Sequence, residues 1–152
     1  MKRVKQTKGN WQYLLNPMEV SLLKDLLKKF PFTGDIPAKI TKTDTNSNAA
    51  EREKLLNESL VEHRQALKRQ AMGLLSAGKF KKTGQEYLFT LTSGEREILL
   101  QILNDIRIGC WVSLGKPESL DLPTATHSAL EIAQHSLMNL AGYFEHHLID
   151  QE

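Results

Sequence analysis

The apolar residues of this chain recur mainly at the three- and four-residue spacing of amphipathic helices. The clearest helix start is at Thr92 and Glu95, which have the Ser/Thr-x-x-Glu spacing of a capping box, and Gly115 follows the last apolar position. At about 100° per residue, one face of this segment is entirely apolar. That face comprises Leu99, Ile102, Leu103, Ile106 and Cys110. The pattern predicts a buried central helix over residues 92–114.

A second helix start precedes it in the chain. Asn16-Pro17-Met18-Glu19 places an N-cap asparagine before a first-turn proline and a carboxylate at the third helical position. This order predicts a helix over residues 17–30. Its inner face is expected to comprise Leu22, Leu23, Leu26, Leu27 and Phe30.

Two longer helices complete the predicted set. Residues 49–77 carry a narrow apolar seam of Leu56, Leu60, His63, Leu67, Ala71 and Leu74. A seam this narrow suits one neighbour, either in the same chain or in a second copy. The last helix is expected to begin at Thr124 or Thr126 and to reach Ile149. Its expected core side comprises Leu130, Ala133, Leu137, Leu140, Ala141, Phe144 and Leu148.

Short strands are predicted at both helix starts. Residues 2–6 and 11–15 are expected to form a hairpin, and residues 86–91 alternate like a strand that leads into the central helix. The basic stretch 79–84 is predicted to be a loop, and the polar stretch 32–48 a flexible linker. The sequence therefore predicts one domain over residues 1–152, mainly α within the α+β class. We expect a four-helix bundle-like core and a small antiparallel sheet from the hairpin and the third strand.

Residues 11–23 and 87–99 resemble each other at an offset of 76 positions. Leu15 corresponds to Leu91, and Glu19 corresponds to Glu95. Each segment reads as a strand, a cap and a helix, so we expect the two strands to meet in one sheet with the helices behind it. Chance similarity between two amphipathic helix starts is the alternative.

Composition narrows the functional classes. The chain has 152 residues, a net charge of +2, 40% hydrophobic and 25% charged residues, and one cysteine. One cysteine forms no intrachain disulfide and no cysteine-based zinc site, and the charge does not indicate nucleic acid or an anionic membrane. No apolar run is long enough for a membrane span or a signal peptide. We expect a cytoplasmic protein without a cofactor.

Polar residues interrupt the predicted central helix at Asn104, Asp105 and Arg107. Its helical angle places Arg107 among apolar residues, so we expect it to be covered and to meet a carboxylate or backbone carbonyls. The carboxylates considered are Asp121, Glu131 and Asp25. One interpretation is a structural tie between helices. The other is a partner-binding site formed by Asn104, Asp105, Arg107 and Trp111.

Two other clusters carry weaker signals. His127, Glu131 and His135 recur every fourth residue, a spacing that metal ligands use but that is also common on solvated helix faces. We expect no native metal there, and no catalytic set is evident. The basic residues near the end of the long helix would suit a phosphate backbone, but a solvated helix face followed by a charged loop is the favoured interpretation. They are Arg64, Lys68, Arg69, Lys79, Lys81 and Lys82.

Three blocks resemble one known family. They are the Leu15-Asn-Pro-Met-Glu19 entry, the Leu-Thr-x-x-Glu entry at Leu91 and, above all, Leu103-Asn-Asp-Ile-Arg107 followed by Gly115. In these blocks the chain resembles a bacterial family catalogued as domain of unknown function number twenty-seventeen. The resemblance implies a link to protein quality control, because actinobacterial members are encoded beside ClpS, the adaptor of the Clp protease. Some members are labelled transcriptional regulators, and the family offers no catalytic residues to transfer.

These observations together favour a non-enzymatic protein-interaction module. Its partner is expected to be another protein, with a possible Clp adaptor link, or a second copy of the chain in a homodimer. The alternative is a nucleic-acid-binding transcriptional regulator.

Overall fold

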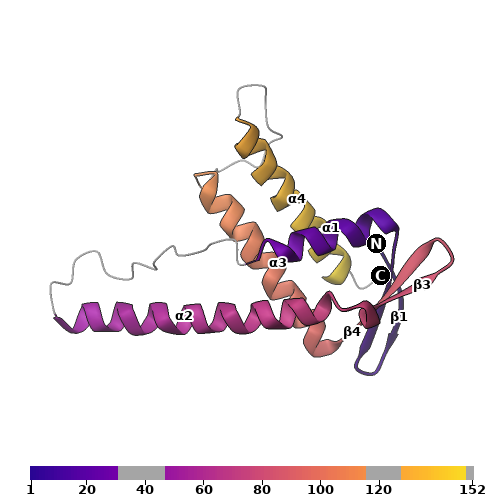
Figure 1. Ribbon diagram of the computed structural model, residues 1–152, viewed down its shortest axis with the longest axis horizontal. Helices are drawn as coiled ribbons and strands as arrows, with labels where there is room; N and C mark the ends of the chain where they lie inside the picture. Colours follow the sequence, from indigo (N-terminus) through magenta and orange to yellow (C-terminus); the bar gives the residue numbers. More distant parts are fainter. Residues whose placement is uncertain (31–46, 116–127, 150–152) are drawn as a thin grey trace.

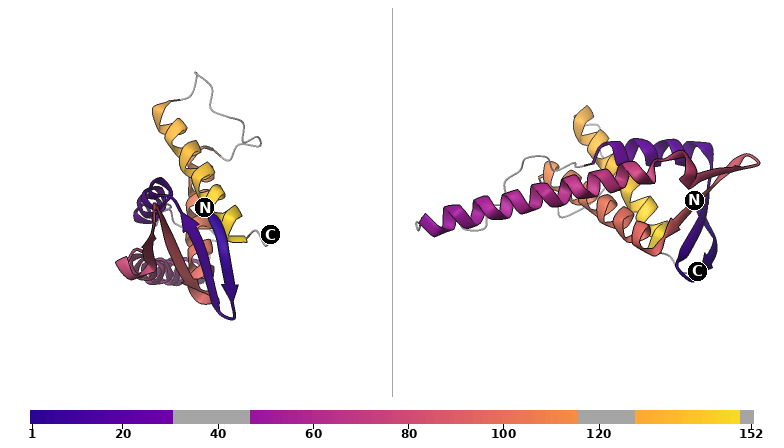
Figure 2. Two further views of the ribbon diagram at one scale, coloured as in Figure 1. Left: turned by 90° about the vertical axis from the view of Figure 1, so that its right-hand side faces the viewer. Right: turned by 60° about the horizontal axis from the view of Figure 1, so that its bottom comes forward.

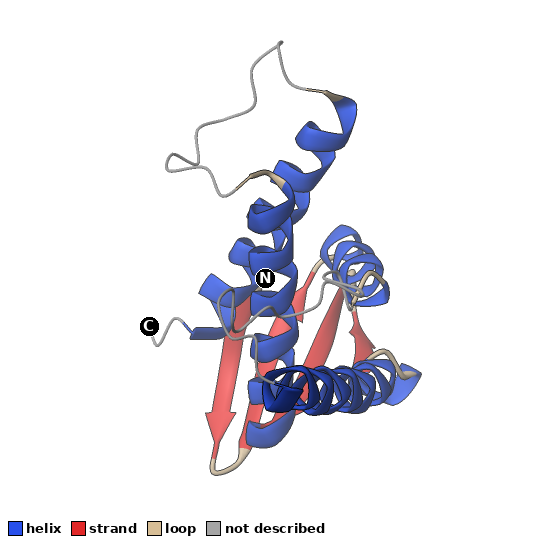
Figure 3. Cartoon of the chain, turned by 90° about the vertical axis from the view of Figure 1, so that its left-hand side faces the viewer, coloured by secondary structure: helices blue, strands red, loops and turns tan. Residues whose placement is uncertain are grey.

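The computed structural model describes residues 1–30, 47–115 and 128–149, in which four helices lie on one face of a four-stranded antiparallel sheet (Figures 1 and 3). This confirms the predicted α+β class, with an N-terminal hairpin and a strand before the third helix. Of the predicted linker 32–48, residues 47 and 48 belong to a helix and the others lie outside the described residues.

The sheet has one strand more than the sequence predicts. Its strands are β1 (Lys2–Thr7), β2 (Asn10–Leu15), β3 (Phe80–Thr83) and β4 (Glu86–Thr92), in the spatial order β1-β2-β4-β3. The predicted basic loop 79–84 is wrong, because most of it forms β3. Two local features favour the strand: Gly84 turns the hairpin with a φ of 64°, and the Phe80 ring stacks on Phe89 at 4.4 Å.

The central pair of strands joins the two repeated segments. In the β2–β4 register Tyr13 lies opposite Phe89, and both side chains are fully buried. The same two residues correspond to each other at the offset of 76. The two hairpin-and-helix units are therefore related by an approximate two-fold axis that passes between Tyr13 and Phe89. This arrangement confirms the predicted repeat.

Both units begin their helices in the same way. Asn16 caps α1 (Pro17–Lys28) and Thr92 caps α3 (Ser93–Ser113), each within a complete capping box. The two capping-box glutamates also bind an ammonium group: Glu19 binds the amino group of Met1, and Glu95 binds Lys79. Each helix start is thus tied to the beginning of the hairpin in its own unit.

Helix α2 (Ser47–Leu74) is 28 residues long, or about 42 Å at 1.5 Å per residue. Among the described residues, α2 contributes to the core cluster from its C-terminal end, with Leu67, Ala71 and Leu74. Residues 47–66, which we call the arm, project from the rest of the described structure (Figures 1 and 2). In the arm, Leu56 and Leu60 are half-buried and His63 is exposed. The predicted seam is therefore buried only in its second half, from Leu67 to Leu74.

Helix α4 (Ala129–Ile149) runs antiparallel along α3. It begins at Ser128, whose hydroxyl accepts from the N–H of Glu131 at 3.2 Å; the predicted caps Thr124 and Thr126 lie outside the described residues. Its far end is held by Arg96, which donates two hydrogen bonds to the carbonyl of Leu148 at 3.0 and 2.6 Å. A cation satisfies the exposed carbonyls at a helix C-terminus well.

Most predicted core positions are confirmed, including the whole predicted face of α3. In α1, however, Leu22 is exposed and Val20 is buried. In α4, Leu130 and Ala133 are exposed, because the first turns of α4 extend past the end of α3 (Figure 1). The sequence did not predict the buried positions of Met138 and Glu145 in α4.

The capping-box glutamates predict a loss of stability in acid. Burial alone would raise the pKa of Glu95, but hydrogen bonds from Lys79 and the Thr92 backbone outweigh it and hold the pKa below its ordinary 4.5. A carboxylate with a lowered pKa stabilises the fold above its unfolded-state pKa and stops doing so as pH falls through its folded-state value. We therefore expect Glu95→Gln to flatten the decline in unfolding free energy below about pH 4.5. Urea titrations at several pH values measure this, and an unchanged slope would contradict it.

Candidate functional site

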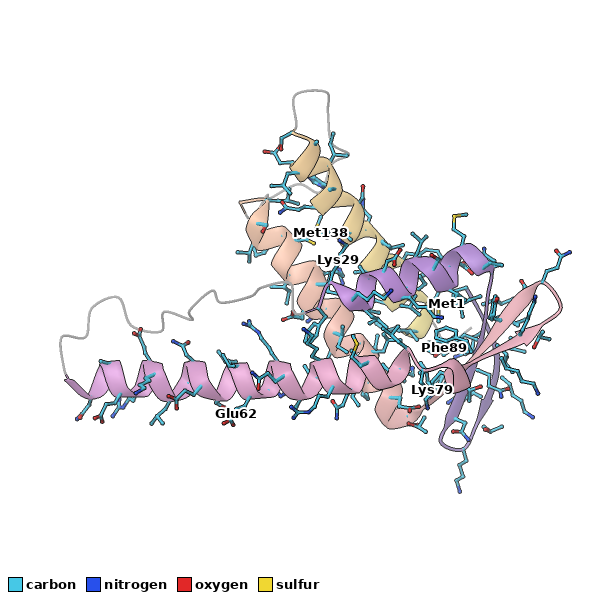
Figure 4. The ribbon with its side chains drawn as sticks, viewed as in Figure 1. Met1, Lys29, Glu62, Lys79, Phe89 and Met138 are labelled. Atoms are coloured by element: carbon cyan, nitrogen blue, oxygen red, sulfur yellow. The ribbon has the colours of Figure 1, made fainter. Side chains whose placement is uncertain are left out.

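A pocket of about 310 Å³ lies on the surface between α3 and α4. Three of the four predicted partner-binding residues line it: Asn104, Arg107 and Trp111. Ile108 of α3 and Met138 of α4, which were not among the predicted site residues, complete the lining, and Figure 4 shows Met138 on α4 beside α3. We call this site the Arg107 pocket. The fourth predicted residue, Asp105, is half-buried and does not line it.

Arg107 is held in place by an ion pair between its Nη1 and Oε2 of Glu145 on α4. The Glu145 side chain is only 9% exposed, whereas the Arg107 side chain is 43% exposed. The prediction that Arg107 is covered is therefore wrong. Its side chain lies at the edge of the helix interface. The expected partners Glu131 and Asp25 are wrong, and Asp121 lies outside the described residues.

The sequence does contain a signal for Glu145. It lies four residues after Ala141 and three before Leu148, both of which belong to the predicted apolar face of α4. A lone carboxylate on an apolar helix face calls for a cation from the facing helix. Gly142 lies three residues before Glu145, and a Cβ at Gly142 would be 3.8 Å from Nε of Arg107. The long arginine side chain thus lies close along α4.

The pocket combines a fixed cation with exposed apolar surface. Ile108 is 49% exposed and Trp111 is 37% exposed, although both belong to α3, whose opposite face is fully buried. A guanidinium offers directional donors to a carboxylate or a backbone carbonyl, while tryptophan and isoleucine offer contact area. Such a surface suits a protein segment that carries both an acceptor and an apolar side chain.

The structure does not gather the six basic residues of the alternative interpretation at one place. Lys79 is paired with Glu95, and Arg64 is half-buried on the arm. Lys68 and Arg69 are exposed on α2, and Lys81 and Lys82 are exposed on β3. Neighbouring residues of a strand point to opposite faces, so Lys81 and Lys82 do not act from one side of the sheet.

Of the three weak metal candidates, the structure describes Glu131 and His135 only. His127 lies outside the described residues, Glu131 accepts from the Ser128 N–H at the helix start, and His135 is buried. Among the residues that the structure describes, no three His, Cys, Asp or Glu side chains are placed to hold one metal ion.

Comparisons with protein-family models, curated proteins and solved structures find no match for this chain. Within residues 1–30, 47–115 and 128–149, no helix is long and apolar enough to cross a lipid bilayer.

Replacing Arg107 tests its coupling to Glu145. We expect Arg107→Ala to lower the free energy of unfolding by about 1–3 kcal/mol, because it leaves a buried carboxylate without its cation while the arginine itself is partly solvated. The double variant Arg107→Met/Glu145→Leu removes both charges and should lose less stability than Arg107→Ala. Urea denaturation compares them, and an equal or larger loss in the double variant would show that the pair is not coupled.

The single cysteine should be chemically silent in the native protein. Cys110 is fully buried in α3, and burial raises the pKa of its thiol to about 11. Because the thiolate is the reactive form, we expect labelling by a thiol reagent at neutral pH to be far slower in native than in urea-unfolded protein. Absorbance of the released chromophore follows the reaction. Equal rates in the two states would mean that α3 opens readily.

Proposed function

We propose that this protein is a non-enzymatic interaction module that binds a segment of another protein at the Arg107 pocket. The observation that carries the proposal is the combination, in one pocket, of a half-exposed arginine anchored by buried Glu145 and the exposed side chains of Ile108 and Trp111. Arginine and tryptophan are enriched among residues that dominate binding energy at protein interfaces.

The lining itself supports binding rather than catalysis. It consists of an amide, a guanidinium and three hydrophobic side chains, from Asn104, Arg107, Ile108, Trp111 and Met138. General acid–base catalysis needs a group that titrates near the working pH, and a guanidinium stays protonated. The same groups are well suited to hold a peptide carbonyl or carboxylate beside an apolar side chain.

The resemblance to the bacterial family suggests the process. Because its distinctive block contains Asn104, Asp105 and Arg107, two of the pocket residues fall within that block. We propose that the chain is a member of this family, that it acts in the bacterial cytoplasm, and that its partner belongs to regulated proteolysis. Nucleic-acid binding is the competing proposal, and the dispersed basic residues do not favour it.

A second copy of the chain is the other partner that we propose. The arm of α2 projects beyond the described body and carries the half-buried leucines 56 and 60. An amphipathic helix gains most of its stability by burying its apolar face against a neighbour. A homodimer would provide that neighbour.

Affinity capture with matched variants tests the pocket. Tagged wild-type protein, Ile108→Glu, Trp111→Ala and the control Leu130→Glu are each used to capture proteins from the native cell extract, with and without nuclease. Leu130 is 68% exposed and lies outside the pocket lining, so its variant should behave like wild type. We expect one partner to be retained by wild type and Leu130→Glu and reduced at least about thirtyfold by both pocket variants, the size of an interface hot spot of about 2 kcal/mol.

Retention of every partner by the pocket variants would contradict the site. Partners that disappear on nuclease treatment would instead support the nucleic-acid alternative.

A further inference from the structure

The arm carries a short seam whose residues are spaced symmetrically. Glu53, Leu56, Leu60 and His63 follow one another at intervals of three, four and three residues. At 3.6 residues per turn these four positions lie along one side of the helix. The seam continues the side of α2 on which Leu67, Ala71 and Leu74 enter the core.

The residue types in this seam match those of a second copy that runs in the opposite direction. When a second helix runs antiparallel with the two-fold axis at residue 58, Leu56 of one copy faces Leu60 of the other, and Glu53 faces His63. Arg64, next to His63, brings a second basic group to the same end. The central contacts are then apolar and each outer contact joins an acidic to a basic residue. A parallel pairing in register would instead place Glu53 against Glu53.

The arm has a physical need for such a neighbour. Glu53, Leu56 and Leu60 are half-buried and His63 is exposed, whereas the seam residues from Leu67 onward are buried in the core. Most of the stability of a helix in a protein comes from packing of its apolar face rather than from helix propensity. Apolar side chains in a seam stabilise it when a facing helix covers them. The opposite side of the arm is charged, and Figure 4 shows Glu62 projecting away from the body there.

We infer that two copies of this chain pair through their arms as an antiparallel two-helix contact centred at residue 58, with Leu56–Leu60 contacts inside and Glu53–His63 contacts outside. This inference rests on the proposed homodimer and adds its register. Within one chain Glu53 and His63 are about 15 Å apart along the helix, so contact between them is possible only across the dimer.

Paired cysteines test the register directly. Disulfides need Cα atoms within about 7 Å, so Glu53→Cys/His63→Cys should form a covalent dimer of twice the 17.2 kDa chain mass under mild oxidation. Neither single variant should do so, because residue 53 lies about 15 Å from its own counterpart in this pairing. The buried Cys110 provides a low background. Non-reducing electrophoresis and peptide mapping measure the product.

Light scattering at high micromolar concentration tests the dimer itself. We expect wild type and Val61→Asp, a change of an exposed residue outside the seam, to have twice the chain mass, and Leu60→Asp to have the monomer mass. Circular dichroism checks that both variants remain folded.

The possible failures are distinguishable. A monomeric wild type overturns the homodimer and its register together. A wild-type dimer whose double-cysteine variant does not cross-link, or whose single-cysteine variants cross-link equally well, overturns only the antiparallel register.

Discussion

The structure depends most on the pairing of β2 with β4, since these strands join two units that lie more than seventy positions apart in the chain. At the centre of this pairing Tyr13 lies opposite Phe89, and both side chains are fully buried. Each strand runs directly into a capped helix, so the pairing also determines where α1 and α3 leave the sheet. Arg96 then ties α4 to the start of α3, and its guanidinium lies 4.2 Å from the Trp11 ring in β2.

Local signals predicted this framework well, because they need only short-range information. A capping box and an apolar face depend on residues close together in the chain. Both capping boxes form as predicted, and so does the apolar face of α3, whereas in α1 Val20 is buried in place of Leu22. The strand β3 was missed because Lys81 and Lys82 make its sequence look like a solvated loop. Its strand conformation depends on Phe80 meeting Phe89, a contact visible only after the hairpin is known.

The candidate site shows a similar division. The sequence identified Arg107 as a polar interruption and placed Asn104 and Trp111 beside it, because these relationships follow from helical angles alone. It assigned the wrong carboxylates to Arg107, since the choice depends on the relative shift of α3 and α4. In the observed packing Arg107 meets Glu145, and Ile108 and Trp111 lie at the open edge of the helix interface.

The position of the arm within the chain has a consequence for how this protein can vary. The first unit ends with the buried side chain of Phe30, and the second begins with Phe80, so α2 is inserted between two units that bind each other directly. Within the part of the chain that the structure describes, α2 joins the core cluster only from Leu67 onward. Whole helical turns could therefore be added to or removed from the arm, and its surface residues could be substituted, while the sheet and the Arg107 pocket keep their geometry. Partner choice at the arm and at the pocket is free to diverge independently.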